Sequence, residues 1–292
     1  MNVFTIKDLE NLSGIKAHTI RIWEQRYQFL KPSRTDTNIR YYSNDELKKV
    51  LNIALLNKYG FKISHIDKMG EAEVNDKILS LTQMQAQQER IVNDLIKCMV
   101  DLDMENFEEI LDKYILSRGI ERSITQIIFP FLEKIGVLWL TNHINPAQEH
   151  LVSNIVRQKL IVGIEGASSS LSINKSVLLF LPEGEYHEMG LLFIYYLLKS
   201  RGVPVIYLGA NIPLQDVEYV AKLKKPAYLY THLTCCGQNF NLDKFINGIT
   251  KKFPTTPIVL SGRLSQAYEK KIPAQINFKK SYQEVVEFIA SI

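Results

Sequence analysis

A glutamate and a histidine separated by one residue form the pair with the clearest chemical potential in this sequence. Glu185 and His187 lie within residues 182–190 (PEGEYHEMG), directly after a short apolar run. A carboxylate can orient an imidazole through one ring nitrogen while the other nitrogen binds a metal ion. Such pairs are also common on protein surfaces, so the pair alone leaves open both a metal ligand and an ordinary solvated loop.

A second group of chemically active side chains is cationic and lies in the first 70 residues. This segment has 8 Lys and 4 Arg against 4 Asp and 3 Glu, a net charge of +5, whereas the whole chain carries +4. A basic end of this kind indicates binding to a polyanion. The side chains that we expect to contact DNA grooves and phosphates are Lys16, His18, Thr19, Arg21, Arg26, Tyr27, Arg34, Arg40 and Tyr41. The alternative is a solvated basic helix with Trp23 and Tyr27 packed in the core.

Length and composition limit the classes of protein that this chain can be. With 292 residues, 46% of them hydrophobic and 23% charged, the chain predicts two or three folded domains. No apolar run approaches the roughly 20 residues that cross a bilayer, and the start lacks an export signal, so we expect a cytoplasmic protein without a membrane partner. Three cysteines, Cys98, Cys235 and Cys236, are too few for a disulfide framework, and we interpret them as buried apolar side chains.

The elements that position the basic residues are short helices and a small wing. Thr5 is a helix cap for residues 6–12, Ser13-Gly14 is a break, and residues 18–27 form a second helix. A polar stretch up to Ile39-Arg40-Tyr41-Tyr42 then predicts a β wing, before residues 43–46 (SNDE) start another helix as a capping box. Residues 1–72 are therefore predicted to be a winged helix-turn-helix domain.

The rest of the chain predicts a helical bundle followed by an α/β domain. Residues 75–168 show helical periodicity, with Pro130 and Pro146 near helix ends. After a serine-containing linker, residues 174–292 alternate helical patterns with five apolar runs, at 177–181, 203–208, 227–233, 258–261 and 276–278. This alternation predicts a five-stranded parallel sheet of the flavodoxin-like, Rossmann-like type, so the fold class is multidomain, α and α/β.

The first segment resembles the amino-terminal domain of MerR-family transcription regulators. The resemblance covers residues 2–70 and rests on Phe4-Thr5-Ile6, Leu12-Ser13-Gly14, residues 19–24 (TIRIWE) and Arg40-Tyr41-Tyr42. It implies a homo-oligomer, a dimer or tetramer, that binds a pseudo-palindromic operator in double-stranded DNA. Cysteines of the family's metal sensors have no counterpart here, so the effector must be sought elsewhere in the chain.

The sheet domain resembles cobalamin-binding domains. Glu185-x-His187-x-x-Gly190 is similar to their D-x-H-x-x-G signature, with glutamate in place of aspartate. Thr231-His232-Leu233 stands for the S-x-L marker, and Ser261-Gly262 stands for the later G-G, at separations that fit the family. The resemblance implies that His187 takes the lower axial position on cobalt.

The same resemblance assigns a role to the small residues. The cofactor's dimethylbenzimidazole tail leaves cobalt and enters a channel between sheet and helices, which requires a small hydroxyl and little side-chain bulk. Thr231 and Gly262 supply these, and Ser261 departs from the family's first glycine in a way that narrows the channel. Ordinary strand-end and turn chemistry is the alternative explanation of Thr231 and Gly262.

The bundle carries one further motif. Trp139, nine residues, and then Glu149-His150 resemble the W-x9-E-H motif of cobalamin-dependent MerR-type photoreceptors, which covers the upper face of the corrin. The alternatives are core packing for Trp139 and a solvated helix start for Glu149 and His150. These relatives carry a histidine directly after the tryptophan, where this chain has Leu140. A second cobalt ligand after photolysis is therefore in doubt, with His143 or His150 as substitutes.

These features lead to three hypotheses. The first is a non-enzymatic transcription regulator, a repressor, that binds adenosylcobalamin or methylcobalamin and in which light changes the oligomeric state. The second keeps the regulator without photochemistry, as a sensor of cobalamin abundance or as a cofactor-independent protein, and Leu140 and Ser261 favour it. The third is a corrinoid-dependent enzyme, which needs a substrate domain that residues 1–170 leave no room for.

Overall fold

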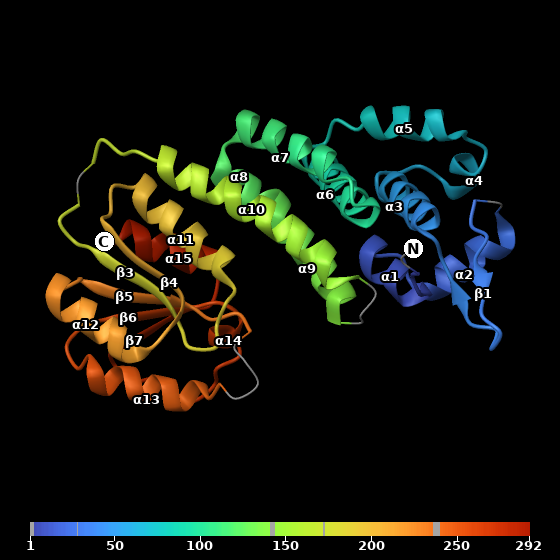
Figure 1. Ribbon diagram of the computed structural model, residues 1–292. Helices are drawn as coiled ribbons and strands as arrows, with labels where there is room; N and C mark the ends of the chain where they lie inside the picture. The colour runs from blue at the N-terminus through green and yellow to red at the C-terminus, as the bar shows by residue number, and fades with distance from the viewer. Residues whose placement is uncertain (1–2, 28, 141–143, 172, 236–239) are drawn as a thin grey trace. The chain divides into compact units, whose positions relative to one another are not determined.

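The chain forms two units that each have their own core. A computed structural model describes residues 3–27, 29–140, 144–171, 173–235 and 240–292, apart from the side chains of Val137, Trp139 and Leu140. The units are Met1–Val156 and Arg157–Ile292. Figure 1 labels their elements.

The first unit begins with the helix-turn-helix. Helix α1 (Ile6–Ser13) starts at Thr5, whose side chain and that of Asp8 cap each other's backbone amides in a capping box. The helix ends at Gly14, whose φ of +74° is the left-handed conformation that terminates helices at glycine. Helix α2 (Ala17–Arg26) follows after three residues, as the predicted helix-turn-helix requires.

The wing is a two-stranded antiparallel ribbon, β1 (Ser33–Arg34) with β2 (Arg40–Tyr41). An antiparallel bridge between Phe4 and Tyr42, both fully buried, joins the wing to the start of the chain. Ser43 and Glu46 then form the predicted capping box of α3 (Asn44–Lys58). Two short helices complete the domain, α4 (Ile63–Ile66) and α5 (Glu71–Leu79).

A helical bundle follows, as its periodicity predicts. Its elements are α6 (Met84–Asp101), α7 (Met104–Arg118), α8 (Ile120–Ser123), the π-helical turn η1 (Ile124–Ile128), α9 (Phe129–Leu140) and α10 (Pro146–Gly166). Pro146 stands in the first turn of α10, where a missing amide costs no helical hydrogen bond, whereas Pro130 lies where η1 passes directly into α9. Phe107 and Phe131 pack edge to face in the core at 5.5 Å between ring centroids.

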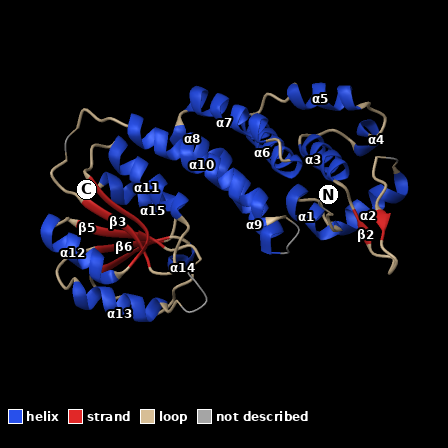
Figure 2. Cartoon of the chain, in the orientation of Figure 1, coloured by secondary structure: helices blue, strands red, loops and turns tan. Residues whose placement is uncertain are grey.

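The second unit is built on a five-stranded parallel sheet, red in Figure 2. The strands are β3 (Val177–Pro182), β4 (Val205–Ile212), β5 (Tyr228–His232), β6 (Ile258–Ser261) and β7 (Ile276–Lys279). Their order is β4-β3-β5-β6-β7, the flavodoxin-like order, so the winding direction reverses between β3 and β5. The predicted fold class is confirmed.

Helices cover both faces of this sheet. On one face, Val217 of α12 (Leu214–Lys224) and Ile246 of α13 (Leu242–Lys252) pack on Leu178 and Phe180 of β3. The opposite face carries α11 (Glu188–Ser200) and α15 (Tyr282–Ala290), while the short α14 (Arg263–Gln266) follows β6. All six residues of β3 are buried, which explains why its apolar run shows no alternation.

Two remaining expectations concern cysteines and membranes. Cys235 is exposed, so its prediction as a buried side chain is wrong, because it follows β5 rather than lying in the strand. Cys98 is partly buried, and burial raises the pKa of its thiol to about 11, while Cys236 lies outside the described residues. Within the described ranges, no helix has both the length and the apolar character that a membrane span requires.

Candidate functional site

Glu185 and His187 form one local arrangement at the carboxyl end of β3. The His187 Nδ1 lies 2.5 Å from Glu185 Oε1, and the same oxygen accepts a hydrogen bond from the His187 backbone amide at 3.0 Å. The Glu185 carboxylate is fully buried, whereas 42% of the His187 side chain is exposed. The imidazole is therefore oriented from inside the domain and presented at its surface.

The Glu185 carboxylate is ionised at neutral pH in spite of its burial. Burial alone raises its pKa, but hydrogen bonds from the side chain and backbone of His187 and from the Cys235 and Thr234 amides outweigh burial and lower the pKa to about 2. Both amides donate to Oε2 at 2.9 Å. The loop after β5 thus holds the Glu185 carboxylate, which in turn orients His187. This contact forms because β5 lies beside β3 in the sheet.

A second histidine, which the sequence analysis did not assign, lies at the same edge of the sheet. His232 ends β5, and its Nδ1 lies 2.8 Å from the Ser261 hydroxyl at the end of β6. Its ring packs over Gly190 in the first turn of α11, so closely that a Cβ at position 190 would lie 2.4 Å from the ring. The available signal was an ionisable residue at the centre of Thr231-His232-Leu233.

The other sheet residues singled out from the sequence are buried around these two histidines. Thr231 Oγ1 is buried and has no hydrogen-bond partner among the described residues. Gly262 has a φ of +94°, and a Cβ there would lie 2.4 Å from the carbonyl oxygen of Leu233, which is fully buried. Close backbone packing is therefore enough to require glycine at position 262.

The motif in the bundle lies on α9 and α10 of the first unit. Trp139 is in α9, but its side chain lies outside the described residues, as does the whole of His143. Glu149 is partly buried in the first turn of α10 and accepts a hydrogen bond from Ser153. His150 is 72% exposed, with its Nδ1 3.3 Å from a Glu149 oxygen.

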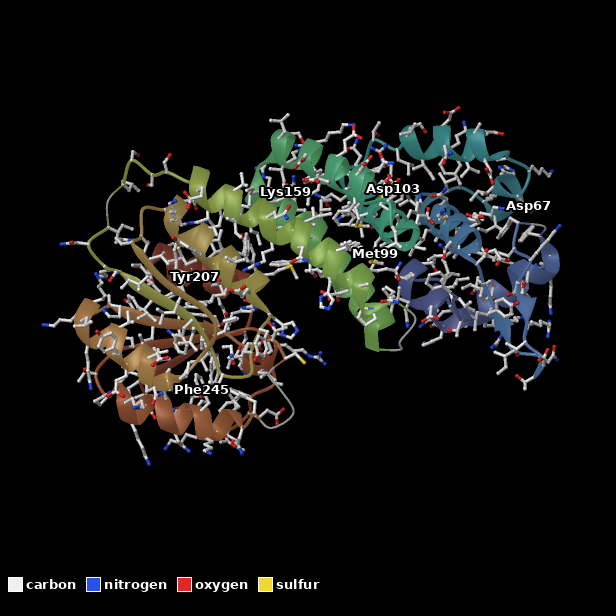
Figure 3. All side chains as sticks on the ribbon, viewed as in Figure 1. Asp67, Met99, Asp103, Lys159, Tyr207 and Phe245 are labelled. Atoms are coloured by element: carbon white, nitrogen blue, oxygen red, sulfur yellow. The ribbon has the colours of Figure 1, made fainter. Side chains whose placement is uncertain are left out.

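The second half of α10 makes polar contacts with α11, and one of them is part of a cluster around Glu188. Arg157 lies 3.0 Å from Glu188, the first residue of α11. The hydroxyl of Tyr207 on β4, labelled in Figure 3, donates to the same carboxylate at 3.0 Å. The start of the helix that follows His187 is thereby tied to both α10 and the edge strand.

The predicted DNA-contacting side chains lie on and around α2. Lys16, His18, Arg21 and Arg26 are exposed, while Thr19 and Tyr27 are partly buried. Lys16 forms an ion pair with Glu10 at 3.4 Å, and the Tyr27 ring stacks on Phe29 at 5.7 Å between centroids. Trp23 is 5% exposed and belongs to the core, which is the structural role that the sequence left open for it.

The wing residues divide into two kinds. Arg34 is exposed and donates a hydrogen bond of 2.6 Å to Asn38 in its own turn. Tyr41 is partly buried. Arg40 instead donates to Glu24 of α2 at 2.9 Å, and Tyr42 donates to the same carboxylate. Arg40 therefore connects the wing to α2.

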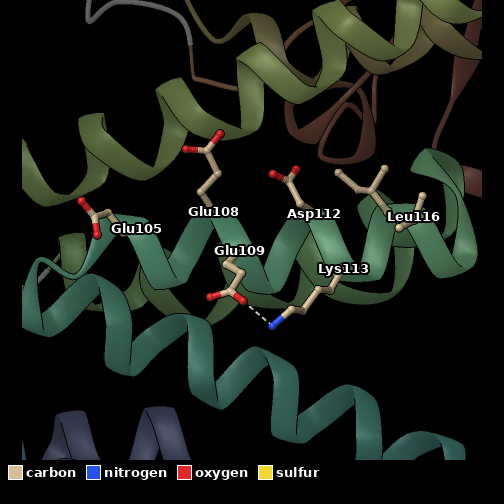
Figure 4. Close-up of a pocket in the computed structure, with 7 residues that line it drawn as sticks. Glu105, Glu108, Glu109, Asp112, Lys113 and Leu116 are labelled. Carbon is tan, nitrogen blue, oxygen red and sulfur yellow. Dashed lines mark ion pairs between the residues drawn. The ribbon is translucent and has the colours of Figure 1, made fainter.

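A hollow on the bundle has the opposite charge. It runs along α7 and is lined by Glu105, Glu108 and Asp112, together with an ion pair between Glu109 and Lys113 (Figure 4). This acidic lining repels phosphate, so this hollow is unsuited to DNA.

Two protein-family models match this chain. Residues 4–73 match the MerR HTH family regulatory protein model, and residues 91–162 match the B12 binding domain model. The chain combines a MerR-type helix-turn-helix with a B12-binding domain. The first match coincides with the winged domain, and the second covers bundle residues that include Trp139, Glu149 and His150.

Two named relatives are similar to this chain over about 70–80% of its length. The HTH-type transcriptional repressor CarH of Myxococcus xanthus is 28% identical over 233 residues, 77% of each chain. The HTH-type transcriptional repressor CarA of the same organism is 29% identical over 210 residues, 71% of this chain and 68% of CarA. The Methanosarcina barkeri monomethylamine corrinoid protein, 14% identical with a TM-score of 0.51 over 70% of this chain and 100% of its own, shares the fold.

The residues of the sheet domain fit a corrinoid at its metal. Within the described part of the chain, no three His, Cys, Asp or Glu side chains converge on a common metal site, but a corrinoid brings its own ring nitrogens and requires one protein ligand. Because Glu185 engages Nδ1 of His187, Nε2 is the ring atom that would coordinate the cobalt of a corrinoid. The buried Thr231 hydroxyl has unused hydrogen-bonding capacity, which a bound group could use. The His232 ring occupies the space over Gly190 at the same edge of the sheet.

Proposed function

We propose that this protein is a transcriptional repressor whose affinity for operator DNA depends on bound cobalamin, with adenosylcobalamin as the cofactor and light as the signal. The observation that carries the proposal is the Glu185–His187 pair, oriented for metal coordination, in a chain that also has a MerR-type helix-turn-helix. Both named relatives are HTH-type transcriptional repressors.

His187 would hold the cofactor through Nε2, and Glu185 would keep the ring oriented by accepting a hydrogen bond from Nδ1. Trp139, Glu149 and His150, which lie in the part of the chain that matches the B12 binding domain model, would cover the opposite face of the cofactor. Adenosylcobalamin supplies a cobalt–carbon bond that light cleaves. A change of oligomeric state after loss of that bond would alter the number of basic domains that engage one operator.

The experiment combines a spectrum, a size and an affinity. The protein is loaded with adenosylcobalamin in darkness, and its absorption spectrum, its mass by light scattering and its affinity for DNA from its own upstream region are measured before and after green light. We expect all three to change together. Corrinoid uptake with an unchanged mass and DNA affinity after illumination would contradict light control and leave cobalamin abundance as the signal.

This second function, a sensor of cobalamin abundance, is favoured by one specific residue. Leu140 follows Trp139 where the light-responsive relatives have histidine, and leucine has no metal-binding atom. Comparing DNA affinity with and without methylcobalamin, in constant darkness, separates the two functions.

A further inference from the structure

The His232 ring closes the edge of the sheet where its winding reverses. In doubly wound sheets, ligands bind outside the carboxyl ends of the strands at this point, here between β3 and β5. His232 stands at the carboxyl end of β5 and reaches across to Gly190, the third residue of α11. The distance of 2.4 Å between a built Cβ at position 190 and ring atoms Cδ2 and Nε2 means that the ring occupies the space that glycine leaves open.

Hydrogen bonds hold this ring in place. The Tyr230 hydroxyl donates to Ser261 Oγ at 2.8 Å, and Ser261 Oγ lies 2.8 Å from His232 Nδ1. Burial lowers the pKa of His232 to about 4, against the opposing charge of Glu185, so the ring is neutral at pH 7. With its hydroxyl oxygen accepting from Tyr230, Ser261 donates its proton to Nδ1, and the ring proton is on Nε2.

Ser261 thereby anchors the His232 ring through its hydroxyl, which glycine lacks. A glycine at 261 has no hydroxyl, so neither the Tyr230 contact nor the His232 contact could form. The pair Ser261 and His232 acts as one unit, in which the serine is the anchor and the imidazole fills the space over Gly190.

We propose that His232 is a displaceable plug, anchored by Ser261, which must rotate away from Gly190 before the nucleotide tail of a corrinoid enters the sheet domain. This inference rests on the proposed cobalamin binding. A corrinoid without a nucleotide tail coordinates through His187 and leaves the plug in place. The chain therefore discriminates against the tail, and the discrimination disappears when the plug or its anchor is removed.

The test compares two corrinoids in darkness. Cofactor-free, full-length protein is titrated with aquocobalamin, which has the tail, and with diaquocobinamide, which lacks it, and both affinities are read from the absorption spectrum. We expect His232→Ala to raise the aquocobalamin affinity about tenfold or more and to leave the cobinamide affinity within twofold. Ser261→Gly should change the ratio in the same direction.

Tyr207→Phe is the matched control. It also removes a side-chain hydrogen bond made by a strand residue, the one from Tyr207 to Glu188, but this bond does not involve His232 or Ser261. It should leave the ratio of the two affinities unchanged. If His232→Ala does not fold, as judged by circular dichroism, Ser261→Gly decides the test. A wild-type ratio in the folded variants overturns the plug alone, whereas failure of every variant to take up either corrinoid overturns the plug and the proposed function together.

Discussion

Two histidines at one edge of the sheet have opposite environments. His187 is exposed and held by an ionised carboxylate, while His232 is partly buried and held by a neutral hydroxyl. The first arrangement favours a ring that offers a nitrogen to a ligand, and the second favours a ring that stays neutral and fills space. The chemistry of each histidine follows from its partner.

The depressed pKa of His232 makes the stability of the cofactor-free protein depend on pH. The unfolded chain protonates this ring near its ordinary pKa of 6.5, and the folded chain only near 4. Above pH 6.5 the ring is neutral in both states and its titration does not affect stability. As pH falls from 6.5 towards 4, the unfolded chain binds the proton first, so the free energy of unfolding decreases.

Replacement by a residue that does not titrate should remove this dependence. Between pH 7 and pH 4.5, we expect the free energy of unfolding to fall less for His232→Gln than for the wild type. The difference between the two proteins should be at most about 3 kcal/mol, and solvent access to the ring reduces it. Urea unfolding of both proteins at several pH values measures the difference. Parallel pH profiles for the two proteins would contradict the neutral, buried state of His232.

At the scale of elements, we expect α2 and the wing to form one DNA-facing surface. If exposed cations on α2 contact DNA chiefly through phosphate, each removed contact should reduce the salt dependence of binding. We expect Arg21→Ala to weaken binding to a random-sequence 30-base-pair duplex and to lower the slope of log affinity against log salt by about 1.

Arg118→Ala is the control for this prediction, since Arg118 is an equally exposed arginine in the last turn of α7. It removes the same charge from the bundle and should leave the salt slope unchanged. Equal effects of the two substitutions would show that net charge, and not the α2 surface, determines DNA binding.

The Glu24 carboxylate joins α2 to the wing through hydrogen bonds. It accepts hydrogen bonds from Arg40 of the wing and from buried Tyr42. We expect Glu24→Ala to lower the free energy of unfolding of the winged domain by about 1–3 kcal/mol, because it leaves a buried hydroxyl without its acceptor. Glu109→Ala, which breaks an exposed ion pair on α7, should cost less than about 1 kcal/mol, and urea unfolding compares the two.

At the scale of the whole molecule, the proposed signal passes from the sheet domain to the oligomer. We expect His187→Ala to abolish any light-dependent change in mass in the presence of adenosylcobalamin, because the oriented imidazole is the group that we propose to hold the cofactor. Light scattering in darkness and after green light measures this. Tyr186→Ala, which removes the exposed neighbouring side chain, should respond as the wild type does, and a response by His187→Ala would place the signal elsewhere.

Local patterns in the sequence were sufficient for the elements and the fold class. The capping boxes at Thr5 and Ser43 depend on residues three positions apart, and the five strands depend on short apolar runs between helical stretches. Periodicity and capping act within a few residues, so they can be read from the chain directly. The same holds for the spacing of Glu185 and His187.

Only the tertiary structure decided which distant residues share an environment. The amides of Thr234 and Cys235 reach Glu185 because β5 lies beside β3, and His232 meets Ser261 and Gly190 because β6 and α11 flank the same strand end. Arg40 was assigned to DNA from its charge, but its bond to Glu24 depends on how the wing folds against α2. Burial and partner choice arise from contacts between segments far apart in the chain, and a single sequence does not encode those contacts in any local pattern.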